Sequence, residues 1–273
     1  MNFQKMFQRI LCCVALSLIG TNNFAAETAQ QVMVFNVRDA VYGATLGLGG
    51  DNSAAIQRAV DAAIQYRTTN ALTAIVYIPK GAYLINNPIY IGDGTATFNS
   101  HSLKLVGDGM ESTNFLIEGN GGFVFRGGPG DPATDFMNWY NNSTSGNVIQ
   151  DMSFRKNTGT GGCPLNLSHA IHPIVENIRI VTQVSGANFS SAIRAGDDYP
   201  IFRNVQIDAG LGSIDTGINL KIAAGSFDGA KITGCFMQWC GIAIYMQARG
   251  ANGRIPNLWP SIDLFSVYNR CGC

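Results

Sequence analysis

The residues best suited to chemistry lie in a short segment that reads Gly-Asp-Asp-Tyr-Pro. It contains Asp197 and Asp198 side by side, and Asp228 follows in a Gly-Ser-Phe-Asp-Gly segment. Paired carboxyl groups cleave glycosidic bonds when one donates a proton and the other activates water. The charge of one carboxylate can keep its neighbour protonated. Adjacent aspartates are also common in solvated turns, so the segment has a catalytic and a purely structural interpretation.

Two histidines and one arginine accompany these acids. His169 and His172 lie in a Ser-His-Ala-Ile-His-Pro segment, and either could move protons or hold a substrate oxygen. His172, just before Pro173, could instead stack in a turn. Arg194 leads into the aspartate pair, and beside an inward isoleucine it is otherwise a solvated residue of an outer face.

A repeat indicates how these residues are positioned. Segments that start at Val148, Ile174 and Ile201 align at spacings of 26 and 27 residues. Their apolar residues alternate, which is typical of strands with one buried face. A weaker fourth copy puts Ile232 at 27 residues after Val205. Repeats of this length indicate a solenoid, because one copy alone cannot bury its apolar face.

Each repeat contains a second strand, and a further copy begins near the end of the sequence. The second strand recurs at Ile193, Ile218 and Ile242, and a fifth copy starts at Ser261. Two or more short strands in each repeat predict an all-β parallel β-helix. The crossover rule for parallel strands predicts a right-handed coil, built from a single chain.

One polar column supports this alignment. Asp151, Asn177 and Asn204 occupy the same place in three successive copies. Stacked Asp and Asn side chains can hydrogen-bond along a solenoid, and they tolerate the left-handed backbone of a sharp turn. We therefore expect a ladder of these side chains, rather than three unrelated turn residues.

The same alignment brings the candidate residues to one edge. Tyr199 and Pro200 fall one repeat after His172 and Pro173. Asp197 and Asp198 are then one coil away from the two histidines, and Asp228 is one coil further along. Tyr199 would join them as a substrate-binding residue.

Residues 52–67 differ from the repeats, because Ile56, Val60 and Ala63 follow helical spacing. Asn52 or Ser53 can cap the start of this helix. An end of a solenoid exposes apolar surface and unpaired strands, so we expect the helix to cover the N-terminal end.

The opening of the chain resembles the pectate-lyase-like superfamily, in its rhamnogalacturonase, epimerase and phage-tailspike branch. The resemblance rests on Asp39, Tyr42–Ala44, Gly50–Asp51, Ala55–Gln57 and Asp61–Ala62, followed by a strand with Pro, Gly and Tyr at 76–85 and a Leu-Lys-Leu-Val-Gly-Asp-Gly segment at 103–109. It extends over roughly residues 34–245. These residues mark the fold and its cap in the family, and they are not catalytic.

The resemblance implies a protein that acts on or binds polysaccharide. A glycoside hydrolase would use the paired acids. A polysaccharide lyase of pectin-like or other acidic glycans would need no other cofactor than Ca²⁺, held here by Asp197, Asp198 and Asp228, with Arg194 as the base. An epimerase, a non-catalytic spike or adhesin, and an inactive fragment are the alternatives. The later polygalacturonase motifs are absent, which excludes a direct assignment to that enzyme.

Two tryptophans are further candidates for contact with sugar. Trp239 and Trp259 could stack on sugar rings, although a role in core packing is an equal alternative.

Residues 1–26 have the pattern of a secretory signal peptide. Lys5 and Arg9 precede an apolar run of 11 residues at 10–20, which is too short to cross a bilayer, and small residues follow near Ala26. We expect a secreted protein, extracellular or periplasmic, whose β-helix domain covers residues 27–273 and which leaves the membrane once the signal is removed. A net charge of zero gives no reason to expect nucleic acid as a partner.

The cysteines and the C-terminus lead to three further expectations. Five cysteines follow the signal, an odd number, and their spacing does not suggest a metal site. Cys240 and Cys271 close similar segments, so a disulfide between them is one possibility. The chain stops inside a coil, which predicts an incomplete domain, or a homotrimer or partner that covers this end.

Overall fold

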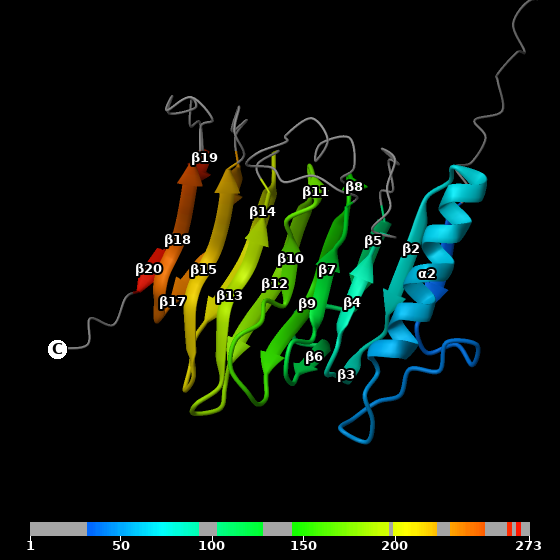
Figure 1. The fold of residues 1–273 in the computed structure, drawn as a ribbon, viewed down its shortest axis with the longest axis horizontal. Coiled ribbons are helices and arrows are strands. Elements are labelled where there is room, and N and C mark those ends of the chain that lie inside the picture. Colours follow the sequence, from blue (N-terminus) through cyan, green and yellow to red (C-terminus); the bar gives the residue numbers. More distant parts are fainter. Residues whose placement is uncertain are drawn as a thin grey trace, which may run out of the picture. The chain divides into compact units, whose positions relative to one another are not determined.

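Parallel strands from successive coils form most of the molecule (Figure 1). The computed structural model describes residues 32–92, 103–127, 144–196, 199–222, 230–248, 261–263 and 266–268. All of them belong to one unit, Val32–Cys273. The predicted signal peptide, Asp197, Asp198, Asp228, Trp259 and Cys271 lie outside the described residues.

The larger sheet has 12 strands, and it holds the first part of every coil. Its main path is β1 (Met33–Asn36), β2 (Ala74–Ile78), β5 (Leu103–Gly107), β9 (Val148–Lys156), β12 (Ile174–Thr182), β14 (Ile201–Asp208), β16 (Lys231–Thr233) and β19 (Ser261–Asp263). Beside this path lie β3 (Gly81–Ile85), β6 (Thr113–Ile117), β17 (Phe236–Gln238) and β20 (Ser266–Tyr268).

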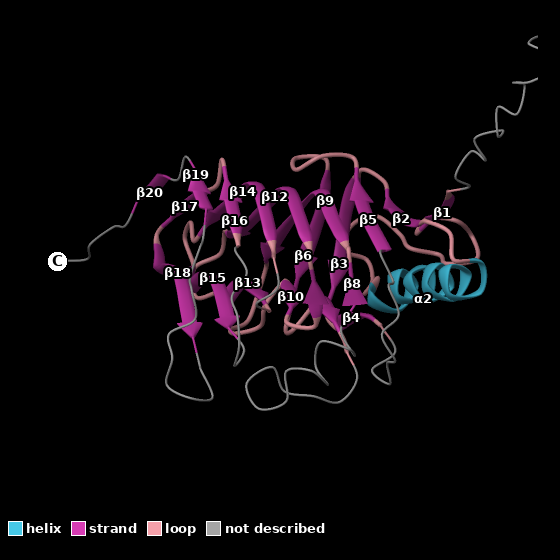
Figure 2. Cartoon of the chain, turned by 90° about the horizontal axis from the view of Figure 1, so that it is seen from above, coloured by secondary structure: helices cyan, strands magenta, loops and turns pink. Residues whose placement is uncertain are grey.

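A second sheet of six strands closes each coil, and Figure 2 shows the two sheets as separate layers. Its order is β18 (Cys240–Ala248), β15 (Ser213–Ile222), β13 (Asn188–Ala195), β10 (Leu165–Leu167), β7 (Gly122–Phe125) and β4 (Pro88–Ile91). The short strands β8 (Thr144–Ser145) and β11 (Ala170–Ile171) pair with each other. The result is a parallel β-solenoid of about five turns, with one helix before it, which confirms the predicted fold class.

The strand register agrees with most of the repeat and corrects one copy. Val175 pairs with Ile149 on one side and with Phe202 on the other, as predicted. However, Ile232 pairs with Phe202, so the predicted spacing from Val205 was wrong. The chain takes 9 residues from Ile193 to Phe202 and 14 from Ile218 to Ile232, although Ile193 and Ile218 are themselves paired. A longer connection after β15 therefore shifts the fourth copy.

The ends of the repeat follow the same pairing. Ser261 pairs with Lys231, so the fifth copy begins where the sequence indicated. In the second sheet Ile218 lies opposite Ile244, while Ile242 lies opposite Thr216. The second strand thus lies where it was predicted. Its isoleucines do not all pair with one another, because their spacing in the sequence is not constant.

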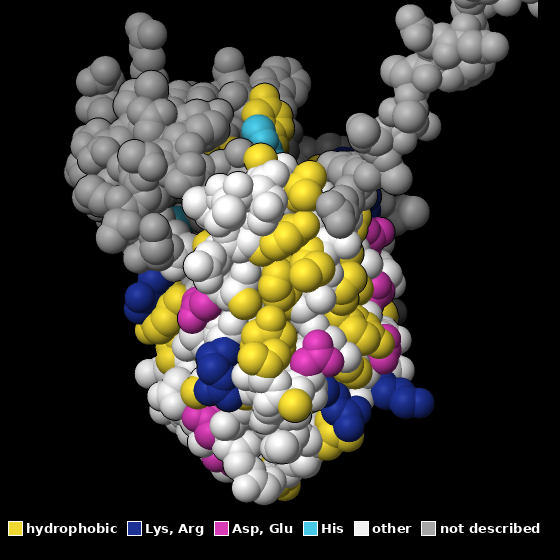
Figure 3. Space-filling model, turned by 90° about the vertical axis from the view of Figure 1, so that its right-hand side faces the viewer, with side chains coloured by type: hydrophobic (Ala, Val, Ile, Leu, Met, Phe, Trp, Pro, Cys, Tyr) yellow, Lys and Arg dark blue, Asp and Glu magenta, His cyan; other side chains and the backbone are white. Residues whose placement is uncertain are grey.

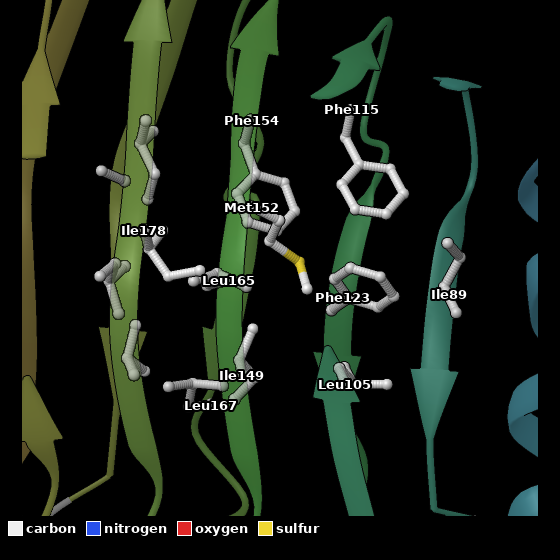
Figure 4. Close-up of a cluster of buried hydrophobic side chains, with 14 of the residues drawn as sticks. Ile89, Leu105, Phe115, Phe123, Ile149, Met152, Phe154, Leu165, Leu167 and Ile178 are labelled. Atoms are coloured by element: carbon white, nitrogen blue, oxygen red, sulfur yellow. The ribbon is translucent and has the colours of Figure 1, made fainter. Parts of the chain in front are cut away.

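Buried apolar side chains fill the middle of the solenoid, and three phenylalanines lie among them (Figure 4). The rings of Phe115 and Phe154 stack with centroids 5.3 Å apart, and Phe123 meets both edge-on. All three side chains are fully buried. Since these phenylalanines come from two successive coils, their contacts hold one coil against the next.

A ladder of polar side chains marks the turn between the two halves of the large sheet. The amide nitrogen of Asn177 donates to Oδ1 of Asp151, and that of Asn204 donates to Oδ1 of Asn177, both at 2.9 Å. The three residues have φ angles between 49° and 62°. Gly234 has the same place in the next coil, with a φ angle of 61°. The predicted ladder is confirmed, with the left-handed backbone that these residue types tolerate.

Replacing Asn177 by alanine is expected to destabilise the protein by about 2–3 kcal/mol, because it removes two hydrogen bonds and because a left-handed turn tolerates alanine less well than asparagine. Asn177→Gly is the matched variant, since it loses the same bonds without the backbone strain. Urea unfolding should rank wild type above Asn177→Gly, and Asn177→Gly above Asn177→Ala. Equal stability of the two variants would contradict the role given to the left-handed backbone.

The helix α2 (Ser53–Asn70) covers the first strands of both sheets, and buries Ile56, Ala59 and Val60. Its N-cap residue is Asn52, but the side chain of Asn52 makes no capping bond to the helix. Instead Asp51 accepts a hydrogen bond from the backbone N–H of Ser53 at 2.9 Å. The cap that the sequence assigned to Asn52 or Ser53 is therefore supplied by Asp51.

Two residues of the family-like opening fasten this helix to the solenoid. Asp51 also accepts hydrogen bonds from the backbone of Asn86 and from the side chain of Asn87. Burial alone would raise the pKa of Asp51, but its hydrogen bonds outweigh this effect and lower it. The amide of Gln57 donates to the carbonyl of Tyr90 at 2.8 Å and accepts from its N–H at 2.6 Å. Both residues thus serve the cap, as the resemblance implied.

A lysine is buried inside the solenoid, which the sequence did not reveal. Lys156 is fully buried, and its ammonium group donates to the carbonyls of Gly119 and Gly161 and lies 5.1 Å from the ring centre of Phe189. Burial lowers the pKa of Lys156 below its ordinary value. Between those two pKa values the unfolded chain binds more protons than the folded one, so stability rises with pH there.

The pH dependence of this lysine can be measured against Lys156→Met. The free energy of unfolding of the wild type, relative to that of Lys156→Met, should increase as the pH rises toward about 10, where lysine ordinarily loses its proton. Urea unfolding at several pH values gives both curves. Lys104→Met, at an exposed position, is the control. A wild-type curve parallel to that of Lys156→Met would contradict the buried ammonium group.

The surface at the α2 end carries both signs of charge. Figure 3 shows lysine and arginine interspersed with acidic side chains, around a band of hydrophobic ones. In the described part of the chain no helix is long and apolar enough to cross a membrane.

Candidate functional site

A row of polar residues crosses the outer face of the six-stranded sheet. Ile193 is fully buried, so the next residue, Arg194, points to the opposite face. Arg194 pairs with Asn166 in β10 and with Asn219 in β15, and Asn219 pairs with Tyr245 in β18. Four successive coils thus present Asn, Arg, Asn and Tyr at one level of the sheet, about 4.8 Å apart.

Two atoms of this row have unused hydrogen-bonding capacity. Arg194 donates from Nη2 to Oγ of Ser190 at 3.2 Å. Its Nε and the Oδ1 of Asn219 are buried, and they have no hydrogen-bond partner within the described structure. Most buried polar atoms are paired, so such atoms need an explanation. A bound ligand that accepts from Arg194 and donates to Asn219 would supply one.

Polar side chains continue along the same face toward the start of the strands. Asn188 donates to Oγ of Ser213 at 2.7 Å and to a carboxylate oxygen of Asp215 at 2.9 Å. Asp215 lies on the same strand as Asn219 and on the same face, four residues earlier, which is about 13 Å. The face therefore has hydrogen-bonding groups over most of the length of its strands.

The predicted edge lies where these strands end. The N–H of Ile201 donates to the carbonyl of Pro173 at 2.8 Å, so the His172 and Tyr199 turns stack as the repeat indicated. The rings of His172 and Tyr199 are 5.3 Å apart, and both side chains are exposed. Both residues have a left-handed backbone. The two ring planes are tilted by 55°, and both rings remain at the surface.

The structure brings together only some of the predicted site residues. Arg194, His172 and Tyr199 lie at or just beyond the carboxyl ends of neighbouring strands, and His169 is half-buried just before β11. Trp239 lies at the opposite end of the sheet, because it precedes β18. The placements of Asp197, Asp198, Asp228 and Trp259 cannot be compared, since these residues are outside the described ranges.

Asn166, Asn219 and Tyr245 were missed from the sequence. The alignment of Ile193 with Ile218 already contained the signal for one of them, because the residue after each inward isoleucine faces outward. Asparagine is typical of turns, so the sequence pattern gives no reason to expect it in the middle of a strand.

A buried thiol under this face is not a nucleophile. Cys163 lies within 3.2 Å of the carbonyl of Leu165 and is almost fully buried. Burial raises the pKa of Cys163 to about 12, with a smaller opposing effect of Arg194. Cys163, Cys235 and Cys240 are all free thiols. The predicted pairing of Cys240 with Cys271 stays a prediction, because Cys271 is not described.

The described residues contain no group of three His, Cys, Asp or Glu side chains that could hold a metal ion. The possible Ca²⁺ ligands Asp197, Asp198 and Asp228 are not among them. Within the row, Asn219 has an amide oxygen of the kind that Ca²⁺ prefers. The Ca²⁺ hypothesis therefore rests on the sequence.

A family model described as rhamnogalacturonase A/epimerase, pectate lyase-like, matches residues 34–248. The chain belongs to this family. Membership of the rhamnogalacturonase A/epimerase family indicates a carbohydrate-related function. Among curated proteins, none matches the chain.

Three solved structures are similar to this member of the rhamnogalacturonase A/epimerase family. ORF18 of Geobacillus virus E2 has 14% identity and a TM-score of 0.41, over 86% of this chain and 61% of that one. The Agl-KA catalytic domain has 18% identity and a TM-score of 0.39, over 90% of this chain and 49% of that one. The A-module of the mannuronan C-5 epimerase AlgE6 from Azotobacter vinelandii has 15% identity and a TM-score of 0.35, over 79% of this chain and 75% of that one. The chain thus spans less than two thirds of the first two structures.

Proposed function

We propose that the protein is an exported enzyme that cleaves a polysaccharide lying across the outer face of the six-stranded sheet. The observation that carries this proposal is the row Asn166–Arg194–Asn219–Tyr245, with buried polar atoms left unpaired in its centre. Solenoids offer extended surfaces, and this row runs along the stacking direction of the coils. A linear polymer of hydroxylated rings matches such a surface.

Three residues of the row have a defined part in binding. Arg194 is a fixed cation that donates to a sugar hydroxyl or to a uronate carboxylate. Asn219 accepts a hydrogen bond from a hydroxyl through Oδ1. Tyr245, with 40% of its surface exposed, offers an aromatic face to a ring one coil further.

The chemical step is assigned to the acids that follow β13. In the hydrolase mechanism, one carboxyl of Asp197 and Asp198 protonates the glycosidic oxygen while the other removes a proton from the attacking water. Asp228 and the two histidines are the remaining candidates for proton transfer. We place hydrolysis ahead of elimination, because Arg194 is bound to Ser190 on the sheet face as a donor and is a strong base only when deprotonated.

Products of polysaccharide digestion test the reaction type. The protein is incubated with pectin, polygalacturonate, alginate and neutral plant glycans. Hydrolysis gives new reducing ends without unsaturated sugars, whereas elimination gives both, and loss of activity with EDTA would favour the Ca²⁺-dependent lyase. Neither product, together with retained binding of a glycan, would contradict the enzyme and favour a non-catalytic glycan-binding β-helix.

Arg194→Ala tests the binding row. We expect KM to rise about 10- to 100-fold, because a hydrogen bond to a charged group contributes about 1.5–3 kcal/mol. Arg203→Ala is the matched control, since Arg203 is an exposed arginine of the next strand in the chain but lies in the other sheet. An equal effect of both variants would refute the assignment of the substrate to this face.

A further inference from the structure

A groove on another part of the surface is not used by this proposal. It has a volume of about 690 Å³ and lies beside the last residues of β12 and β14. Its walls include Arg179, Gln183, Asp208, Gly210, Leu211 and Trp239. The six residues come from three successive coils, so the groove runs along the solenoid.

Trp239 forms one wall in an unusual backbone conformation. It is the single residue between β17 and β18, with a φ of 57° and 44% of its surface exposed. The preceding coil makes the same connection with four residues, Ala209–Gly212, and places a glycine at φ 52°. A left-handed conformation costs a residue with a side chain about 1–2 kcal/mol, and for a bulky side chain it is an outlier worth a functional explanation.

The facing wall offers both donors and acceptors. Asp208 accepts from the N–H of Gly210 at 2.8 Å, which leaves its second carboxylate oxygen available. Arg179 lines the groove and pairs with Glu111 at 2.6 Å, and Glu111 also pairs with Arg155 at 3.5 Å. Gln183 is exposed; its Oε1 accepts a hydrogen bond from Arg155 at 3.4 Å, and its amide nitrogen is a further donor. A sugar ring presents the same combination, with an apolar face for an aromatic ring and hydroxyl groups at its edge.

The charges of the groove restrict the sugar. Arg155 and Arg179 share Glu111, and Asp208 adds a second negative charge, so the charges in and beside the groove balance. A uronate would be repelled by Asp208, whereas the hydroxyl groups of a neutral sugar can donate to it. The occupant should therefore be uncharged.

We propose that this groove is a second glycan-binding site, in which a neutral sugar ring stacks on Trp239 and hydrogen-bonds to Asp208 and Gln183. Cys240, the residue after Trp239, pairs with Ile214, five residues before Asn219. The groove thus lies about 17 Å or more from the row at Arg194. One sugar cannot reach both places, so the groove binds independently of the proposed active face.

Binding of neutral and acidic oligosaccharides to the full chain tests this site. Isothermal titration calorimetry is used with xylo-, cello-, malto-, galacto- and arabino-oligosaccharides, and with oligogalacturonate. We expect at least one neutral oligosaccharide to bind, and Trp239→Gly to weaken that binding at least ten-fold. Trp239→Gly keeps a residue that accepts the left-handed backbone, so it should fold. Trp239→Phe should retain part of the affinity through its ring.

The outcomes distinguish this site from the proposed active face. Arg194→Ala should leave binding in the groove unchanged, even if the chain cleaves no polysaccharide at all. Asp208→Asn should improve binding of oligogalacturonate relative to the wild type. Absence of binding by every neutral oligosaccharide, equal affinity of wild type and Trp239→Gly, or a preference for oligogalacturonate would overturn the proposal.

Discussion

Replacing Asp197 or Asp198 by asparagine should reduce polysaccharide cleavage about 10²- to 10⁴-fold, the range that general acid and base catalysis contributes. Asparagine has nearly the same size as aspartate, but it can neither donate the proton to the leaving oxygen nor accept one from water. The loss should appear in kcat, with KM changed little, because the substrate is held mainly by the row at Arg194. Initial rates from reducing-end assays give both constants.

The control for this experiment is a carboxylate on another strand of the solenoid. Glu176→Gln removes a charge from the outer face of the large sheet, on β12, and should leave kcat unchanged. If Asp197→Asn, Asp198→Asn and Glu176→Gln all retain wild-type activity, the two aspartates are turn residues. The acid and base would then have to be sought among Asp228, His169 and His172.

Phe154→Ala should be the most damaging single change to stability, at about 3–5 kcal/mol. The ring of Phe154 stacks on Phe115 and meets Phe123 edge-on, so its removal opens a cavity between two coils. Val41→Ala, at a position with 72% of its surface exposed, is the control and should change stability by less than about 0.5 kcal/mol.

Urea unfolding followed by circular dichroism measures both changes. Phe154→Leu keeps an apolar side chain at the same place and should lose much less stability than Phe154→Ala. If Phe154→Ala and Val41→Ala shift the unfolding midpoint equally, the aromatic stack does not hold the coils together. A solenoid can unfold in stages, so the loss should be largest in the transition that melts the coils around Phe154.

The fold was predictable because each coil repeats the same pattern of buried and exposed positions. Burial of Ile149, Val175 and Phe202 in one column needs only alternation and a constant spacing, and both are visible in the sequence. The Asn177 ladder follows from the same column. The predicted alignment of the fourth copy was wrong because the connection after β15 changes length. Nothing in the strands themselves indicates that length.

The site was less predictable, for a different physical reason. The contact between Tyr199 and His172 follows directly from the repeat. By contrast, Asn219 becomes notable only because its Oδ1 is buried without a partner, and Trp239 only because its connection is one residue long. Both properties depend on the packing of several coils, whereas a sequence pattern reports one coil at a time.

The side chain of Gln57 has a consequence for self-assembly. A solenoid of parallel coils is a template on which a further chain can polymerise, since the backbone groups of its first strand point away from the stack. In β4 the N–H and carbonyl of Tyr90 are already bound by the amide of Gln57, which imitates the backbone of a missing strand. The helix therefore blocks the addition of another chain to the first strand of the six-stranded sheet. Fibre formation from this end would first have to displace the helix.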